Sequence, residues 1–214
     1  MYKTAIFDLD GTLMNTLEDL TDSLNFSLEK NGFSKRTTDE VRHFLGNGYS
    51  HLINSALPDG ATPAERDKVL SDFQGHYIAN CENKTKPYDG VCEMLCKLSD
   101  AKVKLCIVSN KNDEAVKQLR DKFFPSVNVA IGEREGVKRK PAPDMVVAAL
   151  EELGEDRVNS VYVGDSEVDI LTAENSGVPC ISVGWGFRTH EELISAGAQK
   201  IYDSVDEVYR AIVL

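Results

Sequence analysis

The segment Thr4-Ala5-Ile6-Phe7-Asp8-Leu9-Asp10-Gly11-Thr12-Leu13 is the part of the chain around which the rest can be arranged. Its apolar run from Ala5 to Phe7 predicts a buried strand that leads directly into two acids one residue apart. Because residues i and i+2 of a strand point to the same side, we expect Asp8 and Asp10 to face one site. Two carboxylates buried side by side are costly unless a cation holds them or one carries a proton. The pair is therefore a candidate functional centre.

Two simpler interpretations of this segment fit less well. A surface turn rich in Asp and Gly would not follow directly from an apolar strand. A calcium loop of the EF-hand kind that starts at Asp8 needs a glycine at its sixth position, where this chain has Leu13, and a helix before the loop. Gly11 instead predicts a sharp turn, and Thr12 and Asn15 offer helix-starting chemistry.

The bulk composition bounds the class of protein. The chain has 214 residues, 42% of them hydrophobic, and a net charge of -11, which argues against nucleic acid or an anionic membrane as the main partner. Five cysteines predict reduced thiols in a cytoplasmic protein, and Cys92 and Cys96 lack a second pair of ligands for a zinc site. We find no signal peptide and no apolar run of transmembrane length.

The hydrophobic pattern divides the chain into two parts. Residues of about 15 to 80 contain four helical patterns, two of them opened by capping boxes at Thr37 and Thr62, and no convincing strand. From Pro87 onward strands and helices alternate, which predicts a parallel sheet covered by helices on both faces. The simplest arrangement is an α/β core formed by residues 1–14 and 86–214, with a helical domain, residues 15–85, inserted between them.

Polar residues follow the predicted strands. Ligands of open parallel sheets bind beyond the carboxyl ends of the strands, and four such positions carry suggestive chemistry. They are Asp8 with Asp10, Ser109-Asn110-Lys111, the segment Lys138-Arg139-Lys140-Pro141, and Gly164-Asp165-Ser166 with Asp169 one helical turn later. Oxygen ligands without His or Cys favour a hard cation, above all Mg²⁺, and such a site suits phosphoryl transfer.

Each of these pieces has an ordinary explanation when it stands alone. Ser109-Asn110 is typical of a turn or helix cap, Lys140 of a solvated charge, and Asp165 before Ser166 of a capping residue. The pieces gain weight because they occur together, in this order, at predicted strand ends. Convergence on one site is therefore the expectation to test.

With these residues in view, the chain resembles the haloacid dehalogenase superfamily of hydrolases. The four motifs of that superfamily match here in order and span the whole chain. They are Asp8-Leu9-Asp10-Gly11-Thr12-Leu13, Ser109-Asn110, Lys140-Pro141-Ala142-Pro143, and Gly164-Asp165-Ser166-Glu167-Val168-Asp169. The resemblance implies a Rossmann-like core with a helical cap domain between the first two motifs, in agreement with the insertion inferred from the pattern.

The resemblance also implies roles for individual residues. Asp8 would be the nucleophile that forms an aspartyl-phosphate, and Asp10 the general acid and then the base that activates water. Ser109 and Lys140 would bind the phosphoryl oxygens. The implied magnesium ligands are Asp8, the backbone carbonyl of Asp10, and Asp165, with Asp169 near the metal directly or through water. We also expect Thr12, Asn110 and, in the cap, Gly46 to contribute to substrate binding.

Within the superfamily the chain is similar to the phosphoglycolate phosphatases. This narrower resemblance rests on Phe44-Leu45-Gly46-Asn47-Gly48, on Val183-Gly184-Trp185-Gly186-Phe187 and on Glu191-Glu192-Leu193. Asn15 departs from the pattern, because many relatives carry an acid there. Gly184-Trp185-Gly186 is not a dinucleotide fingerprint, because Thr189 stands where the third glycine should be.

The function expected from the sequence is a Mg²⁺-dependent phosphatase that acts on a small phosphorylated metabolite, as a monomer or homodimer. A phosphomutase shares the first half of the reaction, and a pyrophosphatase, sugar phosphatase or nucleotidase shares the frame. A dehalogenase would have no use for the second acid or the metal. A binding protein without catalysis predicts a broken motif, and none is broken here.

Overall fold

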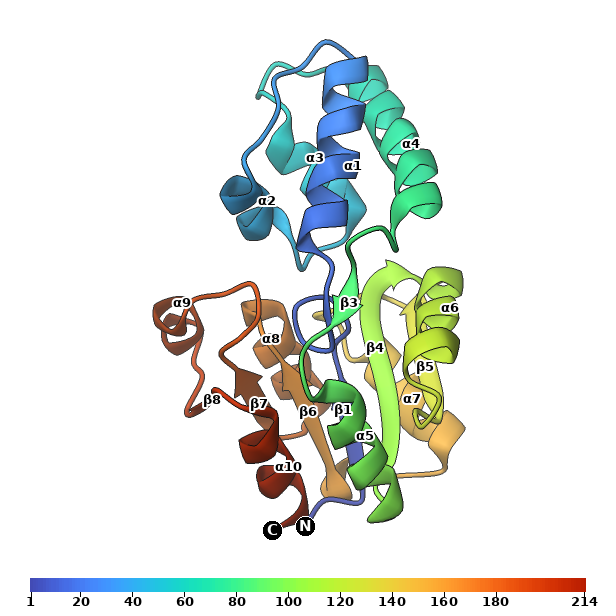
Figure 1. Ribbon diagram of the computed structural model, residues 1–214, viewed down its shortest axis with the longest axis vertical. Coiled ribbons are helices and arrows are strands. Elements are labelled where there is room, and N and C mark those ends of the chain that lie inside the picture. The colour runs from blue at the N-terminus through green and yellow to red at the C-terminus, as the bar shows by residue number, and fades with distance from the viewer. The chain divides into compact units, whose positions relative to one another are not determined.

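The computed structural model describes all 214 residues, and the chain forms two compact units. One unit contains Met1–Met14 and Pro87–Leu214, and the other contains Asn15–Lys86. Figure 1 shows the first as a sheet with helices and the second as helices alone. None of the helices combines the length and the apolar character needed to cross a lipid bilayer.

The sheet of the first unit has six parallel strands in the order β5-β4-β1-β6-β7-β8, so β1 lies near its middle (Figure 1). The strands are β1 (Thr4–Phe7), β4 (Lys104–Asn112), β5 (Val129–Glu133), β6 (Ser160–Gly164), β7 (Cys180–Val183) and β8 (Ile201–Tyr202). Strand β1 pairs with β4 on one side and with β6 on the other. The predicted α/β fold with a parallel sheet is confirmed.

Helices cover both faces of this sheet. The helices of this unit are α5 (Val91–Asp100), α6 (Asp113–Phe123), α7 (Asp144–Leu153), α8 (Glu167–Ser176), α9 (His190–Ser195) and α10 (Val205–Val213), with a 3₁₀ turn at Arg157–Asn159. Ala5 and Phe7 belong to a core cluster with residues of α5, α6 and α10, whereas Ile6 belongs to one with residues of α7 and α8. This alternation along β1 is the period of two that a strand buried on both faces imposes.

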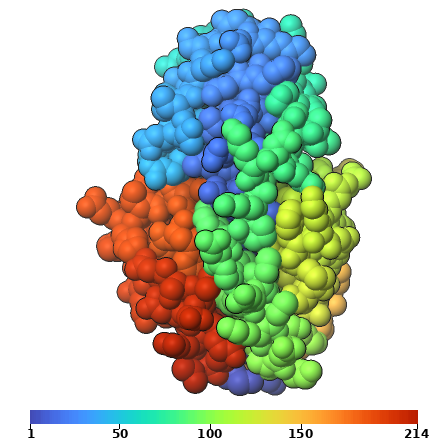
Figure 2. All heavy atoms as spheres, in the orientation of Figure 1, coloured from blue at the N-terminus to red at the C-terminus, as the bar shows by residue number.

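Helices α5 and α10 share one face of the sheet, and Figure 2 shows the green and dark red segments that contain them side by side. A hydrogen bond from the Tyr2 amide to the Ile212 carbonyl, 2.9 Å long, ties the start of the chain to α10. The face is filled by complete burial of Val208 and Ile212 on α10 and of Leu95 on α5. Packing on this face therefore holds in place strands such as β4, whose carboxyl end carries one of the polar motifs.

The second unit is built from four helices. They are α1 (Leu17–Lys30), α2 (Thr38–Phe44), α3 (Tyr49–Ala56) and α4 (Pro63–Asn80). Both expected capping boxes form, with Thr37 accepting from the Glu40 amide and Thr62 from the Glu65 amide. Its apolar contacts include Leu20 and Leu24 of α1 and a cluster of three rings from Tyr49, Phe73 and Tyr77.

One charged side chain is buried in the second unit, that of Asp19. Its carboxylate accepts hydrogen bonds from the amides of Lys84, at 2.9 and 3.1 Å, and of Thr85, at 2.8 Å. The first turn of α1 is thereby fastened to the end of the same unit. Helical spacing gave no signal for this contact, because the partners are main-chain groups 65 and 66 residues away.

The structure adds two features to the sequence interpretation. First, β2 (Met14–Asn15) and β3 (Lys86–Pro87) pair in a separate two-stranded ladder, which the sequence pattern did not predict. Second, β4 does not end at Val108 as expected but continues through Ser109, Asn110 and Lys111 to Asn112, with a register irregularity on the way. Polar side chains do not end a strand whose backbone still finds partners.

Candidate active site and metal centre

Asp8 directly follows β1, and its amide continues the pairing of that strand by donating to the Val163 carbonyl at 2.9 Å. Its carboxylate accepts from the Leu9 amide at 2.7 Å and faces the Lys140 ammonium at 2.8 Å. Burial raises the pKa of Asp8 well above its usual value, and the charges of Asp169 and Asp165 add to this although Lys140 opposes it. The folded site therefore disfavours the charged form of Asp8 unless further positive charge is present.

Asp165 follows β6 and is held at both oxygens. The Thr12 hydroxyl donates to one at 2.8 Å, and the Phe187 amide donates to the other at 2.7 Å. Burial, together with the charge of Asp169, raises the pKa of Asp165 to about 7, against the opposing effect of these two donors and of Arg188. The two donors thus fix the orientation of the Asp165 carboxylate, but its negative charge is not fully compensated, and a bound cation would stabilise it.

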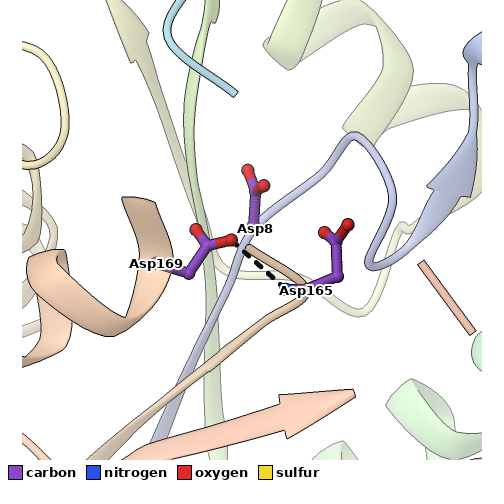
Figure 3. A group of neighbouring side chains, drawn as sticks. All are labelled: Asp8, Asp165 and Asp169. Atoms are coloured by element: carbon purple, nitrogen blue, oxygen red, sulfur yellow. Dashed lines mark hydrogen bonds between the residues drawn. The ribbon is translucent and has the colours of Figure 1, made fainter. Parts of the chain in front are cut away.

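Asp169 lies in the first turn of α8 and is completely buried. One oxygen accepts from Lys140 at 2.8 Å and from the Tyr162 hydroxyl at 3.1 Å. The other accepts from the Ser166 hydroxyl at 2.6 Å and from the amides of Ser166 and Asp165 at 3.1 and 3.2 Å. Asp169 therefore completes the capping box of α8, whose N-cap is Ser166, and at the same time binds the Asp165 amide of the preceding loop (Figure 3).

Asp8, Asp165 and Asp169 together form a candidate metal centre. Each offers a carboxylate oxygen, and these oxygens all lie within 4.8 Å of one another (Figure 3). An all-oxygen donor set matches hard divalent cations. Three buried carboxylates against the single ammonium of Lys140 leave negative charge that a cation would neutralise, so the residues present fit a bound metal ion.

Glycines allow the backbone to close around these acids. A Cβ at Gly11 would lie 2.3 Å from an oxygen of Asp165, and one at Gly186 would lie 2.2 Å from the Cβ of Asp165. A Cβ at Gly164 would lie 2.3 Å from that of Asp169. These separations are shorter than real Cβ contacts, so any side chain at these positions would displace the acids. Gly186 gave no signal in the sequence beyond its place in the resemblance.

Lys140 is buried among its partners. Burial alone would favour a neutral amine, but the charges of Asp169 and Asp8 outweigh it and raise the pKa of Lys140. The Lys140 backbone is held from both sides. Its amide donates to Asn110 Oδ1 at 2.8 Å, and Asn110 Nδ2 donates to its carbonyl at 3.1 Å. The Asn110 side chain thus braces the backbone of Lys140, and its contribution to substrate binding stays a prediction.

Asp10 has a different partner from Asp8. Strand β1 ends at Phe7, so the same-side rule for residues two apart in a strand does not govern the two acids. Both oxygens of Asp10 lie 2.9 Å from the ammonium of Lys111 on β4. The sequence placed Lys111 at a strand end but gave it no role. Extension of β4 through this residue is what brings it to the site.

The other expected site residues are placed as follows. Ser109 is buried on β4, where its hydroxyl accepts from the Lys111 amide at 3.2 Å. Thr12 holds Asp165, as described, and its carbonyl accepts from the Trp185 ring at 3.1 Å. Gly46 belongs to the helical unit. The binding roles of Ser109, Thr12 and Gly46 stay predictions.

Arg188 is a further buried charge near the centre that sequence reasoning missed. It forms a two-pronged ion pair with Glu167, with nitrogen–oxygen distances of 2.7 and 2.9 Å. Burial opposes its charge, but Glu167 more than compensates and raises the pKa of Arg188. The pair joins the segment after β7 to the start of α8, beside Asp165. Its two members lie 21 residues apart, and no local pattern connects them.

Comparison with known proteins identifies the class of this fold and site. The sequence pattern of the family described as haloacid dehalogenase-like hydrolase matches residues 5–183, and the chain belongs to this family. The predicted resemblance is therefore confirmed, as is the prediction that the chain is an enzyme of the hydrolase class.

Individual relatives narrow the comparison. The chain is 35% identical to a phosphoglycolate phosphatase of Agrobacterium fabrum, over 86% of this chain and 81% of the relative. It is 31% identical to a phosphoglycolate phosphatase of Caulobacter vibrioides, over 98% and 90%. A crystal structure from Lactobacillus delbrueckii subsp. bulgaricus, provisionally described as a phosphoglycolate phosphatase, superposes with a TM-score of 0.95 at 38% identity and covers 99% of this chain and 98% of that one.

Proposed function

We propose that this hydrolase is a Mg²⁺-dependent phosphatase that cleaves a small phosphorylated metabolite, with 2-phosphoglycolate as the leading candidate substrate. The observation that carries the proposal is the buried cluster of Asp8, Asp165 and Asp169 with Lys140, at the end of the central strand. The choice of substrate is supported by the names of relatives that are 31% and 35% identical to this chain.

The proposed reaction has two steps on Asp8. An oxygen of Asp8 attacks phosphorus, the bond from phosphorus to the ester oxygen breaks, and Asp10 gives its proton to the leaving alcohol. Asp10 then takes a proton from water as that water attacks the phosphorus of the aspartyl-phosphate. The bond from phosphorus to Asp8 breaks, inorganic phosphate leaves, and both acids return to their starting states.

The neighbouring residues prepare Asp8 for this role. Lys140 holds one Asp8 oxygen at 2.8 Å and supplies positive charge for the phosphoryl oxygens, and the Ser109 hydroxyl is proposed to donate to them. Asp8, Asp165 and the backbone carbonyl of Asp10 are the proposed magnesium ligands, with Asp169 near the ion. A bound Mg²⁺ would stabilise the charged form of Asp8 and neutralise phosphoryl oxygens.

We extend the proposal to the helical unit, residues 15–85, as a cap domain that limits the size of the substrate. This part rests on the family resemblance and on Gly46-Asn47-Gly48, where Gly46 has a φ of 109° and Gly48 a φ of 78°. These left-handed conformations favour glycine and suit a segment that changes conformation. Gly46 is the proposed substrate contact.

A phosphate-release screen tests the proposed function. The panel contains 2-phosphoglycolate, pyrophosphate, hexose phosphates and nucleoside monophosphates, each assayed with Mg²⁺, with EDTA, and with Mg²⁺ restored. We expect release from 2-phosphoglycolate to exceed that from the other compounds by orders of magnitude and to stop in EDTA. Turnover that resists the chelator would contradict the metal assignment. Transfer of phosphate between positions of a hexose, without net release, would identify a mutase.

A further inference from the structure

We propose that Lys111 is a positioning residue that holds the carboxylate of Asp10 in the orientation needed for proton transfer to the leaving group. The inference rests on the proposed function, because it assumes that Asp10 exchanges protons with the substrate and with water. It concerns a residue outside the four motifs that identified the site.

The geometry of the ion pair carries the proposal. The Lys111 ammonium lies 2.9 Å from each oxygen of Asp10, so it contacts the carboxylate symmetrically and restricts its rotation. The two partners differ in exposure, because the Lys111 side chain is 1% exposed and that of Asp10 is 21% exposed. The ammonium therefore approaches from the protein side and leaves the carboxylate accessible on the other.

The two residues lie on different elements, one on a strand and one in a turn. Lys111 is part of β4 and lies between Val108 and Asn112, the two positions at which β4 pairs with β5 on either side of a register irregularity. Asp10 lies in the turn after β1, at a bridge to Met14, and the next residue donates its amide to the Met14 carbonyl at 2.9 Å. A buried side chain on a strand thus contacts one on a turn, and such support from a neighbouring element is what holds a reactive group in its orientation.

The location of the pair also argues for function over stability. A buried ammonium contributes little net stability when paired and costs much when its partner is lost. Ion pairs of this unit away from the site are more exposed, as in Lys117 with Asp113 on α6, where the Lys117 side chain is 44% exposed. Burial of Lys111 beside the proposed proton donor therefore points to orientation of Asp10.

Leaving-group dependence tests the proposal. The variant Lys111→Met is compared with wild type on 2-phosphoglycolate, whose alcohol needs a proton to leave, and on p-nitrophenyl phosphate, whose nitrophenolate leaves without one. We expect kcat/KM for 2-phosphoglycolate to fall about 10²-fold, the usual contribution of a positioned acid. For p-nitrophenyl phosphate we expect a smaller loss, of about tenfold. Lys117→Met is the matched control and should change neither value.

A double-mutant cycle with Asp10→Asn separates positioning from direct substrate contact. If Lys111 acts through Asp10, then adding Lys111→Met to Asp10→Asn lowers kcat/KM for p-nitrophenyl phosphate no further. Independent, multiplying losses would overturn the proposal, and so would equal losses on both esters in the single variant. Lys111→Arg, which keeps the charge, should recover part of the activity on 2-phosphoglycolate.

Two controls keep these outcomes interpretable. Thermal melting shows whether each variant folds, and Lys111→Gln, which keeps a hydrogen-bond donor, replaces Lys111→Met if the latter does not. If wild type releases no phosphate from either ester with Mg²⁺, the proposed function itself fails. A wild type that is active on both esters, combined with a Lys111 variant that is unaffected, refutes only the role of Lys111.

Discussion

Buried charge distinguishes the α/β unit from the helical unit. Seven charged residues of the chain are buried, and six of them belong to the α/β unit: Asp8, Lys111, Lys140, Asp165, Asp169 and Arg188. The helical unit buries only Asp19, whose carboxylate is satisfied by main-chain amides. That unit also has ion pairs at its surface, such as Lys35 with Glu29, in which both side chains are exposed to solvent.

This difference in buried charge implies that the α/β unit, and not the helical unit, contains a cluster that destabilises the folded state. Burying several charges together destabilises a protein unless each finds a partner. Of the three clustered carboxylates, those of Asp8 and Asp169 share the single ammonium of Lys140, so the cluster is not fully compensated by protein groups. The helical unit follows the usual rule, with apolar helix faces inside and charges outside. The presence of this cluster in one unit alone therefore supports our proposal that the chemistry takes place there.

The largest effect is expected from removing the proposed nucleophile. Asp8→Asn keeps the shape of the side chain but cannot form the aspartyl-phosphate, so turnover should fall by roughly 10⁴-fold or more while the protein remains folded. Steady-state phosphate release and thermal melting measure the two effects. Asp121→Asn, on the exposed part of α6, is the matched control and should retain activity. Full activity of Asp8→Asn would exclude the covalent mechanism.

The second prediction concerns the cost of the buried cluster. Because the pKa of Asp165 is raised from 3.8 to about 7 in the folded chain, the metal-free folded state keeps a proton that the unfolded state loses. The free energy of unfolding of metal-free wild type should therefore fall, relative to Asp165→Asn, as the pH rises from about 4 to about 7. At the upper end the variant should be more stable by roughly 2 to 4 kcal/mol.

Urea unfolding in EDTA at a series of pH values measures this difference. Saturating Mg²⁺ should raise the stability of wild type, because a ligand that binds the folded state stabilises it, and should raise that of Asp165→Asn much less. A wild type whose advantage or deficit relative to the variant does not change with pH would show that Asp165 is not strained in the folded chain.

The third prediction tests the buried charge of the helical unit. Asp19→Ala leaves the amides of Lys84 and Thr85 without their acceptor, and we expect a loss of about 1–3 kcal/mol in the free energy of unfolding. The neighbouring Asp22→Ala removes an exposed partner of Lys84 and should change stability little. Equal effects of the two substitutions, measured by urea unfolding, would remove the distinction between them.

The smallest effect is expected from an exposed pair. Lys35 and Glu29 lie 3.0 Å apart, but their side chains are 57% and 67% exposed. Lys35→Ala should therefore change the free energy of unfolding by less than about 0.5 kcal/mol, and added salt should leave the stability difference near zero. A loss comparable to that of Asp19→Ala would contradict the view that surface charge in this unit contributes little.

Local patterns predicted the elements of this fold well. The apolar run of β1, the alternation of strands and helices after Pro87, and the capping boxes at Thr37 and Thr62 are all short-range signals, and the structure confirms each of them. The strands β2 and β3 were not foreseen, because each has two residues and forms only by pairing with a segment about 70 residues away. A pairing of that range leaves no local pattern.

The sequence by itself determined the α/β class, the order of the motifs and the identity of the acids at the end of β1, because these follow from residue type and spacing. Only the tertiary structure decided which charge faces which. Asp8 meets Lys140, whereas Asp10, two residues later, meets Lys111, because β4 runs past its predicted end and Asn110 binds the backbone of Lys140. Such pairings depend on the register of neighbouring strands and on the path of loops, which are settled when distant segments pack together.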